Sequence, residues 1–431
     1  MRLKRIHAIA LSLALILQLL SVPLAAAHED RPRPRSEQLI FFVADGMRQD
    51  IAKRYAEART LAEAMPVTEL PKWAEANLRK KLAGSLLPTF RKLFRNGVSA
   101  EEDGLLTQAP PNTGTGWYSL ATGAWPAVHG STNNTFHVNG QPFGSATSAF
   151  TPGVLQAETI AQAAERGGKK VAQIEWSGGR IGTIAGPTLD YRSFFSGRGV
   201  ATNYISPLDR ADFVISFGLQ FDHPAGFAGQ APYPEASPLA ATGWTNVPAS
   251  YSPPKEMRLR VLDFGTDKYG LNAYLFDSTN DGRVNYDRVL FSPTKDGKDA
   301  VATLARDQWG EVKVTIKGGS LDGKTAGMLL KVEMLMPDLS KVRLFHTSVA
   351  RATATWPGWP GDPGCAGCDF AEYVARKFPV STGADYAVLE AGIVSEETYV
   401  EQGLYWEQGY HPLIEYIAKT EIGRASCRER V

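Results

Sequence analysis

A stretch of small and polar residues at 112–134, NTGTGWYSLATGAWPAVHGSTNN, carries the side chains best suited to chemistry in this chain. It opens on Thr113 among small residues, continues as a short apolar segment and reaches Gly123. This pattern predicts a loop that leads into a short helix, with Thr113 at the helix N-terminus. Free backbone N–H groups and the positive end of the helix dipole favour a bound phosphate there. A threonine at this position can also be an ordinary N-cap, and the stretch alone leaves both interpretations open.

A second candidate, Asp45, follows the apolar run at 38–44 and precedes Gly46. A continuous apolar run that stops at glycine predicts a strand buried on both faces, as in a parallel sheet. Because α/β proteins bind ligands beyond the carboxyl ends of such strands, Asp45 is a candidate site residue. The alternative is a turn residue before glycine.

The elements that would position these residues alternate along the chain. Helices are predicted within 51–81, with breaks at two prolines, and at 87–94, 158–165, 370–377 and 411–419, with strands at 98–100 and 169–176. This alternation predicts a doubly wound α/β core with a mostly parallel sheet, formed by residues 28–206 and 352–420.

Between 207 and 351 the chain becomes rich in Pro, Gly and polar residues. Short alternating stretches there predict strands joined by tight turns. We therefore expect a β-rich insertion, with strands at 258–262, 272–276, 288–291, 312–316 and 328–335.

Both ends of the chain are distinctive. A basic start, an apolar run and the small residues before position 28 predict a secretory signal at 1–27, and hence a periplasmic or secreted protein. At the other end, residues 421–431 read EIGRASCRERV and resemble a translated sequencing adapter, so we interpret them as a non-native tail. The chain holds 46 basic and 45 acidic residues, a balance that argues against binding nucleic-acid polymers.

Cys427 falls in that tail, which leaves Cys365 and Cys368 as a CxxC pair. Such a pair can be a redox motif, half of a zinc site or a local disulfide. With an oxidising compartment expected, we predict a disulfide.

Three segments in this order resemble the alkaline phosphatase superfamily: LIFFVADGMR at 39–48, LPTFRKLFRNGV at 87–98, and the stretch at 112–134. The resemblance is closest to the type I phosphodiesterase/nucleotide pyrophosphatase branch. That branch has a strand-end Asp-Gly, a threonine nucleophile five residues before Tyr-Ser-Leu-x-Thr-Gly, and then Pro-x-x-His-Gly. In this chain Thr113 precedes Tyr118 by five residues, and Pro126 and His129 follow.

The resemblance implies an alkaline-phosphatase-like fold and two Zn²⁺ ions, with Asp45 and Thr113 as metal ligands. Thr113 would attack phosphorus, because a metal-bound threonine hydroxyl loses its proton more easily. Asn134 would donate a hydrogen bond to a phosphoryl oxygen, and the backbone N–H of Gly114 would assist.

The chain departs from the family pattern in two places. Thr115 and Gly116 stand where the family has Pro-Asn, which makes Thr115 a rival nucleophile. The later Asp-x-x-x-His, Asp-His and final His ligands are missing, and the Asp222–His223 pair falls in the expected insertion, where a loop is predicted. We interpret the missing ligands as lying beyond residue 420, and expect this chain to bind zinc poorly and to hydrolyse little.

A separate acidic stretch, DSTNDGRVNYD at 277–287, has oxygen-bearing side chains at alternate positions and resembles a Ca²⁺ loop. However, Arg288 stands where a bidentate glutamate is needed, so a hairpin turn is the alternative. The candidate calcium ligands are Asp277, Thr279, Asp281, Asn285 and Asp287.

Together these observations predict an exported phosphoesterase of the phosphodiesterase/nucleotide pyrophosphatase type, with a small phosphate ester as substrate. A phosphomonoesterase on the same fold and a non-catalytic binding protein are the alternatives.

Overall fold

The computed structural model describes residues 38–65, 84–100, 108–181, 183–194, 198–264, 267–316 and 319–422. The predicted signal peptide at 1–27 and nearly all of the tail at 421–431 lie outside these residues. The chain divides into two units, 1–105 and 106–431, and each is described by itself.

The first unit contains the helices α2 (Gln49–Glu57), α3 (Leu61–Ala64) and α5 (Pro88–Asn96). α5 begins at Pro88 and ends at Gly97, which confirms the helix predicted there. Proline suits the first turn of a helix because the N–H that it lacks would have no partner there. α2 and α5 pack against each other, and Ala56 of α2 is buried.

The strand predicted at 38–44 is wrong for this structure. The segment pairs with no strand among the described residues, and Leu39 and Ile40 are 77% and 92% exposed. Asp45 is also exposed and lies in a turn, where Gly46 has a φ of +71°. The strand predicted at 98–100 is likewise absent from the described part of this unit. A run of apolar residues predicts burial, but it does not show that a neighbouring strand is available for pairing.

The second unit holds the remaining helices. Several begin with a recognisable signal, such as the capping box of Thr159 and Gln162 that starts the third of them. No helix in the described residues is long and apolar enough to cross a membrane. The helices are α6 (Thr113–Thr122), α7 (Pro126–His129), α8 (Ile160–Arg166), α9 (Ala211–Ser216), α10 (Phe370–Lys377), α11 (Tyr386–Glu390) and α12 (Glu396–Ile417).

An eight-stranded sheet forms the middle of this unit, in the order β3-β4-β15-β13-β14-β5-β6, with β12 also paired to β13. Only the β3–β4 and β5–β6 pairs are parallel. The strands are β3 (Gln173–Ile174), β4 (Thr188–Phe194), β5 (Gly199–Thr202), β6 (Gln220–Asp222), β12 (Trp309–Thr315), β13 (Thr325–Leu335), β14 (Val342–His346) and β15 (Ala350–Thr355).

This sheet corrects the predicted doubly wound, mostly parallel core. The fold is mixed α/β, but β14 and β15 return along the chain to pair antiparallel with β5 and β4. Four strands from the stretch predicted as an insertion, β6, β12, β13 and β14, therefore belong to the same sheet as β4 and β5. The domain boundaries at 206 and 351 stay predictions.

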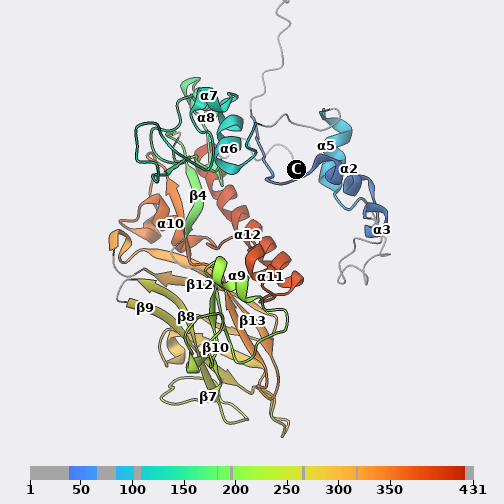
Figure 1. The fold of residues 1–431 in the computed structure, drawn as a ribbon, viewed down its shortest axis with the longest axis vertical. Helices are drawn as coiled ribbons and strands as arrows, with labels where there is room; N and C mark the ends of the chain where they lie inside the picture. Colours follow the sequence, from blue (N-terminus) through green and yellow to red (C-terminus); the bar gives the residue numbers. More distant parts are fainter. Residues whose placement is uncertain are drawn as a thin grey trace, which may run out of the picture. The chain divides into compact units, whose positions relative to one another are not determined.

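The second large sheet has five antiparallel strands in the order β11-β10-β9-β8-β7. They are β7 (Leu239–Ala240), β8 (Lys255–Phe264), β9 (Asp267–Phe276), β10 (Arg288–Ser292) and β11 (Ala302–Leu304). With β12 and β13 they confirm the five strands predicted from alternating hydrophobicity. Leu259 and Phe291 of this sheet share one core with Met328 and Leu344 of the larger sheet. Within the second unit, α6, α7 and α8 lie at one end and the five-stranded sheet toward the other (Figure 1).

The helices α10 and α12 cover the other part of the larger sheet through a second core, which includes Phe370 and Leu413. Cys365 and Cys368, which precede α10, are joined by a disulfide. The predicted α10 helix at 370–377 is confirmed, whereas α12 is much longer than the helix predicted at 411–419.

The acidic stretch at 277–287 connects β9 to β10, which pair as antiparallel neighbours. Asp277 is buried, and its carboxylate accepts hydrogen bonds from the Ser252 hydroxyl at 2.6 Å and from two loop N–H groups. Asp287 accepts from both the backbone and the hydroxyl of Ser278. Together the two carboxylates thus accept hydrogen bonds from the loop and from Ser252. This geometry favours the hairpin turn over the calcium loop.

Candidate active site at the N-terminus of α6

Thr113 is the first residue of α6 and lies one position inside the N-cap, which is Asn112. Its side chain is partly exposed, and its hydroxyl makes no hydrogen bond to the described residues. The helix ends where Gly123 adopts a left-handed conformation with φ of +64°, as the sequence predicts. The predicted position of Thr113 at the helix start is therefore confirmed, and Asn112 takes the cap position.

Asn134 provides the hydrogen bond that the N-cap side chain does not provide. The Asn112 carboxamide makes no capping bond, but Asn134 Oδ1 accepts a hydrogen bond from the Gly114 N–H at 2.6 Å. With its oxygen held there, the NH₂ group of Asn134 is the free donor of the amide, and the side chain is exposed. The structure thus brings Thr113, Gly114 and Asn134 together around one helix N-terminus.

Thr115, the rival nucleophile, has a different environment. It is fully buried, and its hydroxyl donates to Asn112 Oδ1 at 3.0 Å. A hydroxyl that is buried and engaged in this way is poorly placed to meet a substrate. Of the two threonines, Thr113 has the more accessible side chain.

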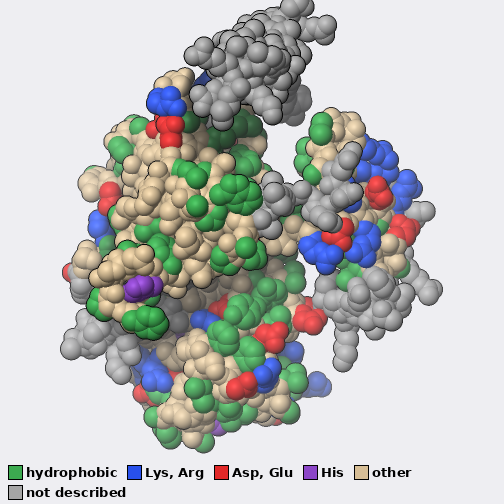
Figure 2. Space-filling model, turned by 45° about the horizontal axis from the view of Figure 1, so that its top comes forward, with side chains coloured by type: hydrophobic (Ala, Val, Ile, Leu, Met, Phe, Trp, Pro, Cys, Tyr) green, Lys and Arg blue, Asp and Glu red, His purple; other side chains and the backbone are tan. Residues whose placement is uncertain are grey.

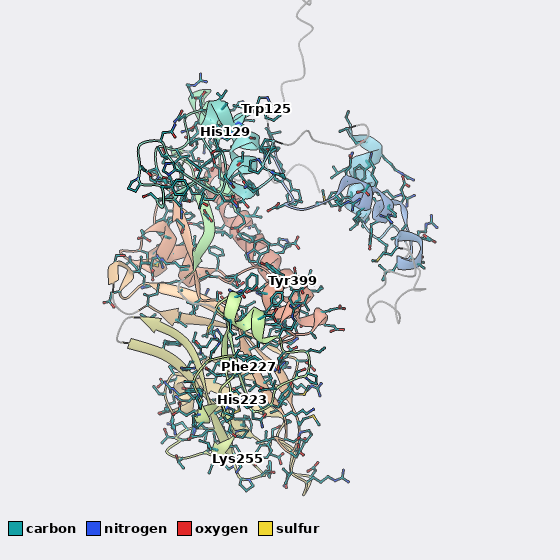
Figure 3. The ribbon with its side chains drawn as sticks, in the orientation of Figure 1. Trp125, His129, His223, Phe227, Lys255 and Tyr399 are labelled. Carbon is teal, nitrogen blue, oxygen red and sulfur yellow. A yellow bond between two sulfur atoms is a disulfide. The ribbon has the colours of Figure 1, made fainter. Side chains whose placement is uncertain are left out.

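His129, the motif residue to which the sequence assigned no role, holds the loop that carries Asn134. It lies at the end of α7 (Figure 3). It is completely buried there, and its ring packs on Tyr118. Nδ1 accepts from the Ser131 N–H at 3.2 Å, so Nε2 carries the proton and donates to Ser119 Oγ at 3.1 Å. Burial lowers the pKa of His129, which keeps the ring neutral at neutral pH. The spacing Pro-x-x-His-Gly could have identified this positioning role.

Glycine is required at two points of this arrangement. At Gly130, which has a φ of +86°, an added Cβ would lie 2.5 Å from the carbonyl oxygen of Val154. At Gly114, an added Cβ would lie 2.5 Å from Ala149 Cβ and 3.2 Å from Asn134 Oδ1. These distances are shorter than ordinary van der Waals contacts. The loop and the helix can therefore pack together only if residues 114 and 130 have no Cβ atom.

Replacing Gly114 by Ala is therefore expected to lower the free energy of unfolding by about 1–3 kcal/mol, because the added methyl group overpacks the contact with Ala149. Gly116→Ala is the matched control on the same helix, since its nearest neighbour is the end of the Gln108 side chain at 3.3 Å. Denaturant unfolding of both variants measures the difference. Equal stability of the two variants would contradict this description of the site.

The remaining predicted metal ligand lies apart in the chain. Asp45 belongs to the first unit and Thr113 to the second, so a metal that joins them stays a prediction. Within the described ranges, no group of three or more His, Cys, Asp or Glu side chains is placed to hold a metal ion. The described residues alone do not complete a two-zinc centre.

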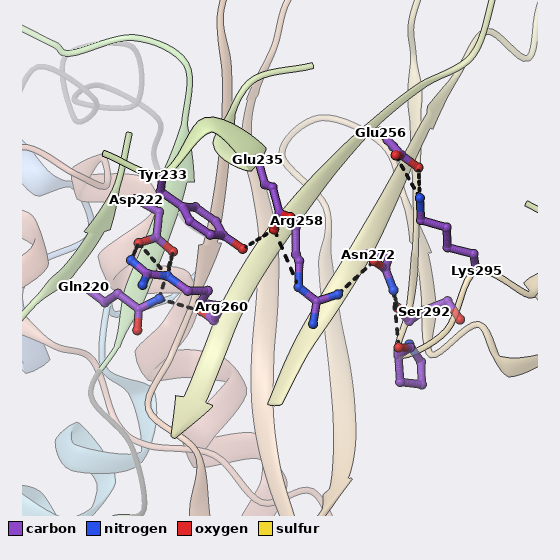
Figure 4. Close-up of polar contacts among 11 residues, drawn as sticks. Gln220, Asp222, Tyr233, Glu235, Glu256, Arg258, Arg260, Asn272, Ser292 and Lys295 are labelled. Atoms are coloured by element: carbon purple, nitrogen blue, oxygen red, sulfur yellow. Dashed lines mark hydrogen bonds and ion pairs between the residues drawn. The ribbon is translucent and has the colours of Figure 1, made fainter. Parts of the chain in front are cut away.

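Asp222, part of the Asp-His pair predicted to lie in a loop, is instead the last residue of β6 and is 1% exposed. Its carboxylate forms an ion pair with Arg260 and accepts from Gln220 Nε2 at 2.9 Å (Figure 4). His223 Nδ1 accepts from the Ala225 N–H at 3.2 Å. Asp222 is thus a buried structural ion-pair partner.

A partly exposed threonine hydroxyl and a polar donor at a helix N-terminus are features that favour the binding of an anion. Residues 74–222 match the family model described as type I phosphodiesterase / nucleotide pyrophosphatase, a family of the alkaline phosphatase superfamily. The resemblance predicted from the three motifs is thereby confirmed for this part of the chain. The matched residues include Thr113 and Asn134 and begin after Asp45. No curated protein and no solved structure matches the chain.

Proposed function

We propose that this chain carries a phosphoesterase of the phosphodiesterase/nucleotide pyrophosphatase type, with Thr113 as its nucleophile. The observation that supports this most is the family match across residues 74–222, which contains the constellation of Thr113, Gly114 and Asn134. The accessibility of Thr113, compared with the buried Thr115, supports the choice of nucleophile.

In the proposed reaction, Thr113 Oγ forms a bond to phosphorus while the bond from phosphorus to the leaving ester oxygen breaks. The leaving oxygen takes up a proton, and a phosphothreonine remains. Water then attacks phosphorus, the Oγ–P bond breaks and the threonine hydroxyl is restored. The Asn134 NH₂ would donate to a phosphoryl oxygen, where negative charge increases in the transition state.

Two Zn²⁺ ions, with Asp45 as one ligand, remain part of the proposal because the resemblance implies them. They would lower the pKa of the threonine hydroxyl and stabilise the leaving oxygen. The described residues do not complete such a centre, so we expect slow turnover by this chain. The proposal also includes export and a small phosphate-ester substrate, without binding to nucleic-acid polymers.

Hydrolysis of bis-p-nitrophenyl phosphate, compared with p-nitrophenyl phosphate, tests the substrate class. With excess Zn²⁺ present, we expect the diester to be cleaved faster, because the matched family acts on diesters and pyrophosphates. A large preference for the monoester would instead support the phosphomonoesterase alternative, in which a basic residue such as Arg180 or Arg192 would meet the additional charge. Because slow turnover is expected, the non-catalytic alternative is favoured only if, at high protein concentration, hydrolysis of both compounds is no faster than with Thr113→Ala.

A further inference from the structure

A cavity of about 500 Å³ lies between α2 and α5 in the first unit. Its volume is within the range of pockets that hold small organic ligands. The described residues that line it all belong to this unit, and they are Lys53, Ala56, Glu57, Arg91, Phe94, Arg95 and Ser99.

The lining is strongly basic. Lys53 on α2 and Arg91 and Arg95 on α5 face a single carboxylate, that of Glu57. None of the three cations forms an ion pair with a residue that the structure describes, unlike the buried arginines of the second unit. Figure 2 shows Lys and Arg side chains gathered on the first unit. The surplus of positive charge in one cavity favours an anionic ligand.

One donor in this lining, Arg91 Nε, is shielded from solvent and has no partner among the described residues. Buried donors almost always have an acceptor, and an unsatisfied one calls for an explanation. A phosphate oxygen would supply the acceptor, since guanidinium groups bind phosphates through paired N–H groups.

The cavity also has an apolar side, formed by Phe94 and Ala56. The Lys53 ammonium lies 5.9 Å from the centre of the Phe94 ring, which holds this cation beside an aromatic surface. A bare inorganic ion would leave that ring and much of the volume unused. We infer that the cavity between α2 and α5 binds a small phosphate-bearing organic molecule, with its phosphate at the two arginines and its organic part against Phe94.

Binding of AMP and of inorganic phosphate by isothermal titration calorimetry tests this inference. The measurement uses the full chain with Thr113→Ala and a metal chelator, so that the proposed nucleophile and any bound metal cannot contribute. Because Thr113 is absent, the result does not depend on the proposed function. We expect AMP to bind more tightly than phosphate. We also expect the affinity for AMP to fall as the salt concentration is raised.

The matched variants lie on one helix and remove the same charge. Arg91→Gln is expected to weaken AMP binding about tenfold, because it removes a charged hydrogen bond. Lys92→Gln, whose side chain does not line the cavity, is expected to change the dissociation constant by less than about twofold. Lys53→Gln tests the opposite wall on α2 if Arg91→Gln does not fold.

Three results would overturn the inference. The first is no measurable binding of AMP or of phosphate. The second is the same loss of affinity in Arg91→Gln and Lys92→Gln, which would indicate a general charge effect. The third is equal binding of phosphate and AMP, which would leave no role for Phe94 or for an organic part of the ligand.

Discussion

Replacing Thr113 by Ala is expected to reduce the slow diester hydrolysis of this chain, measured at high protein concentration with excess Zn²⁺, to the uncatalysed rate, because a covalent mechanism cannot proceed without its nucleophile. Thr113 has the accessible hydroxyl at the start of α6, beside the Gly114 N–H and the Asn134 amide. The methyl group of alanine fits the same backbone, so the effect on the fold should be small. Hydrolysis of bis-p-nitrophenyl phosphate measures the loss.

Thr115→Ala is the matched control, since it removes the neighbouring hydroxyl two residues along the same helix. That hydroxyl is buried and donates to Asn112, so its loss should reduce stability more than turnover. Mass spectrometry of acid-quenched protein provides a second readout, with a phosphate expected on the peptide that contains Thr113. Loss of turnover in Thr115→Ala, with normal turnover in Thr113→Ala, would move the nucleophile to Thr115.

Local signals predicted several elements well. Pro88 and Gly97 marked both ends of α5, and Asp369 at the N-cap with charged residues in the last turn marked α10. The alternation of apolar and polar residues predicted β8, β9, β10, β12 and β13. These features depend on residues close together in the chain, which is why the sequence alone carries them.

The sheet topology was harder to predict than these elements, because strand pairing depends on residues that are far apart in the sequence. A continuous apolar run at 38–44 satisfied the pattern of a buried strand, yet it pairs with no described strand. Conversely, β14 and β15 pair with β5 and β4 across more than a hundred residues, and no local pattern shows that their direction is antiparallel.

The site was predicted in its residues but only partly in its contacts. The motif brought Thr113, Gly114 and Asn134 into one hypothesis, and the structure places them together. No motif in the chain predicted that Asn134 would accept a hydrogen bond from the first turn of α6, or that a neutral His129 would hold the intervening loop. Both contacts arise from the path of the chain between α7 and Asn134, which spacing alone does not describe.

Replacing Glu372 by Gln is expected to lower the free energy of unfolding at neutral pH by about 3–5 kcal/mol, because the buried Arg351 would then keep only the more exposed Asp369 carboxylate, at 3.8 Å, as a countercharge. Arg351 and Glu372 are 4% and 2% exposed, and their side chains meet at 2.6 Å between β15 and α10. Burial opposes ionisation of Glu372, but the Thr325 hydroxyl and N–H, with Arg376 and Arg351, lower its pKa to about 2. Trp356, in the same core, reports unfolding by fluorescence.

The contacts of Glu372 also determine how the free energy of unfolding depends on pH. The pKa of Glu372 is about 2 in the folded chain, against an ordinary value of 4.5, so the unfolded chain takes up the proton first as pH falls. Its contribution, about 3 kcal/mol, is therefore complete above pH 4.5 and is lost as the pH falls from there toward 2. Glu372→Gln should flatten the stability profile in this window.

Glu158→Gln is the matched control for this prediction, since Glu158 also accepts two hydrogen bonds from an arginine, Arg166, but in an exposed pair. Solvent screens that pair, so its removal should leave both the stability and the acid profile nearly unchanged. Replacing both buried partners, with Arg351→Met and Glu372→Leu, should recover much of the lost stability, because no unpaired charge remains. If Glu372→Gln behaves like Glu158→Gln, the buried pair does not hold α10 to the sheet as the structure indicates.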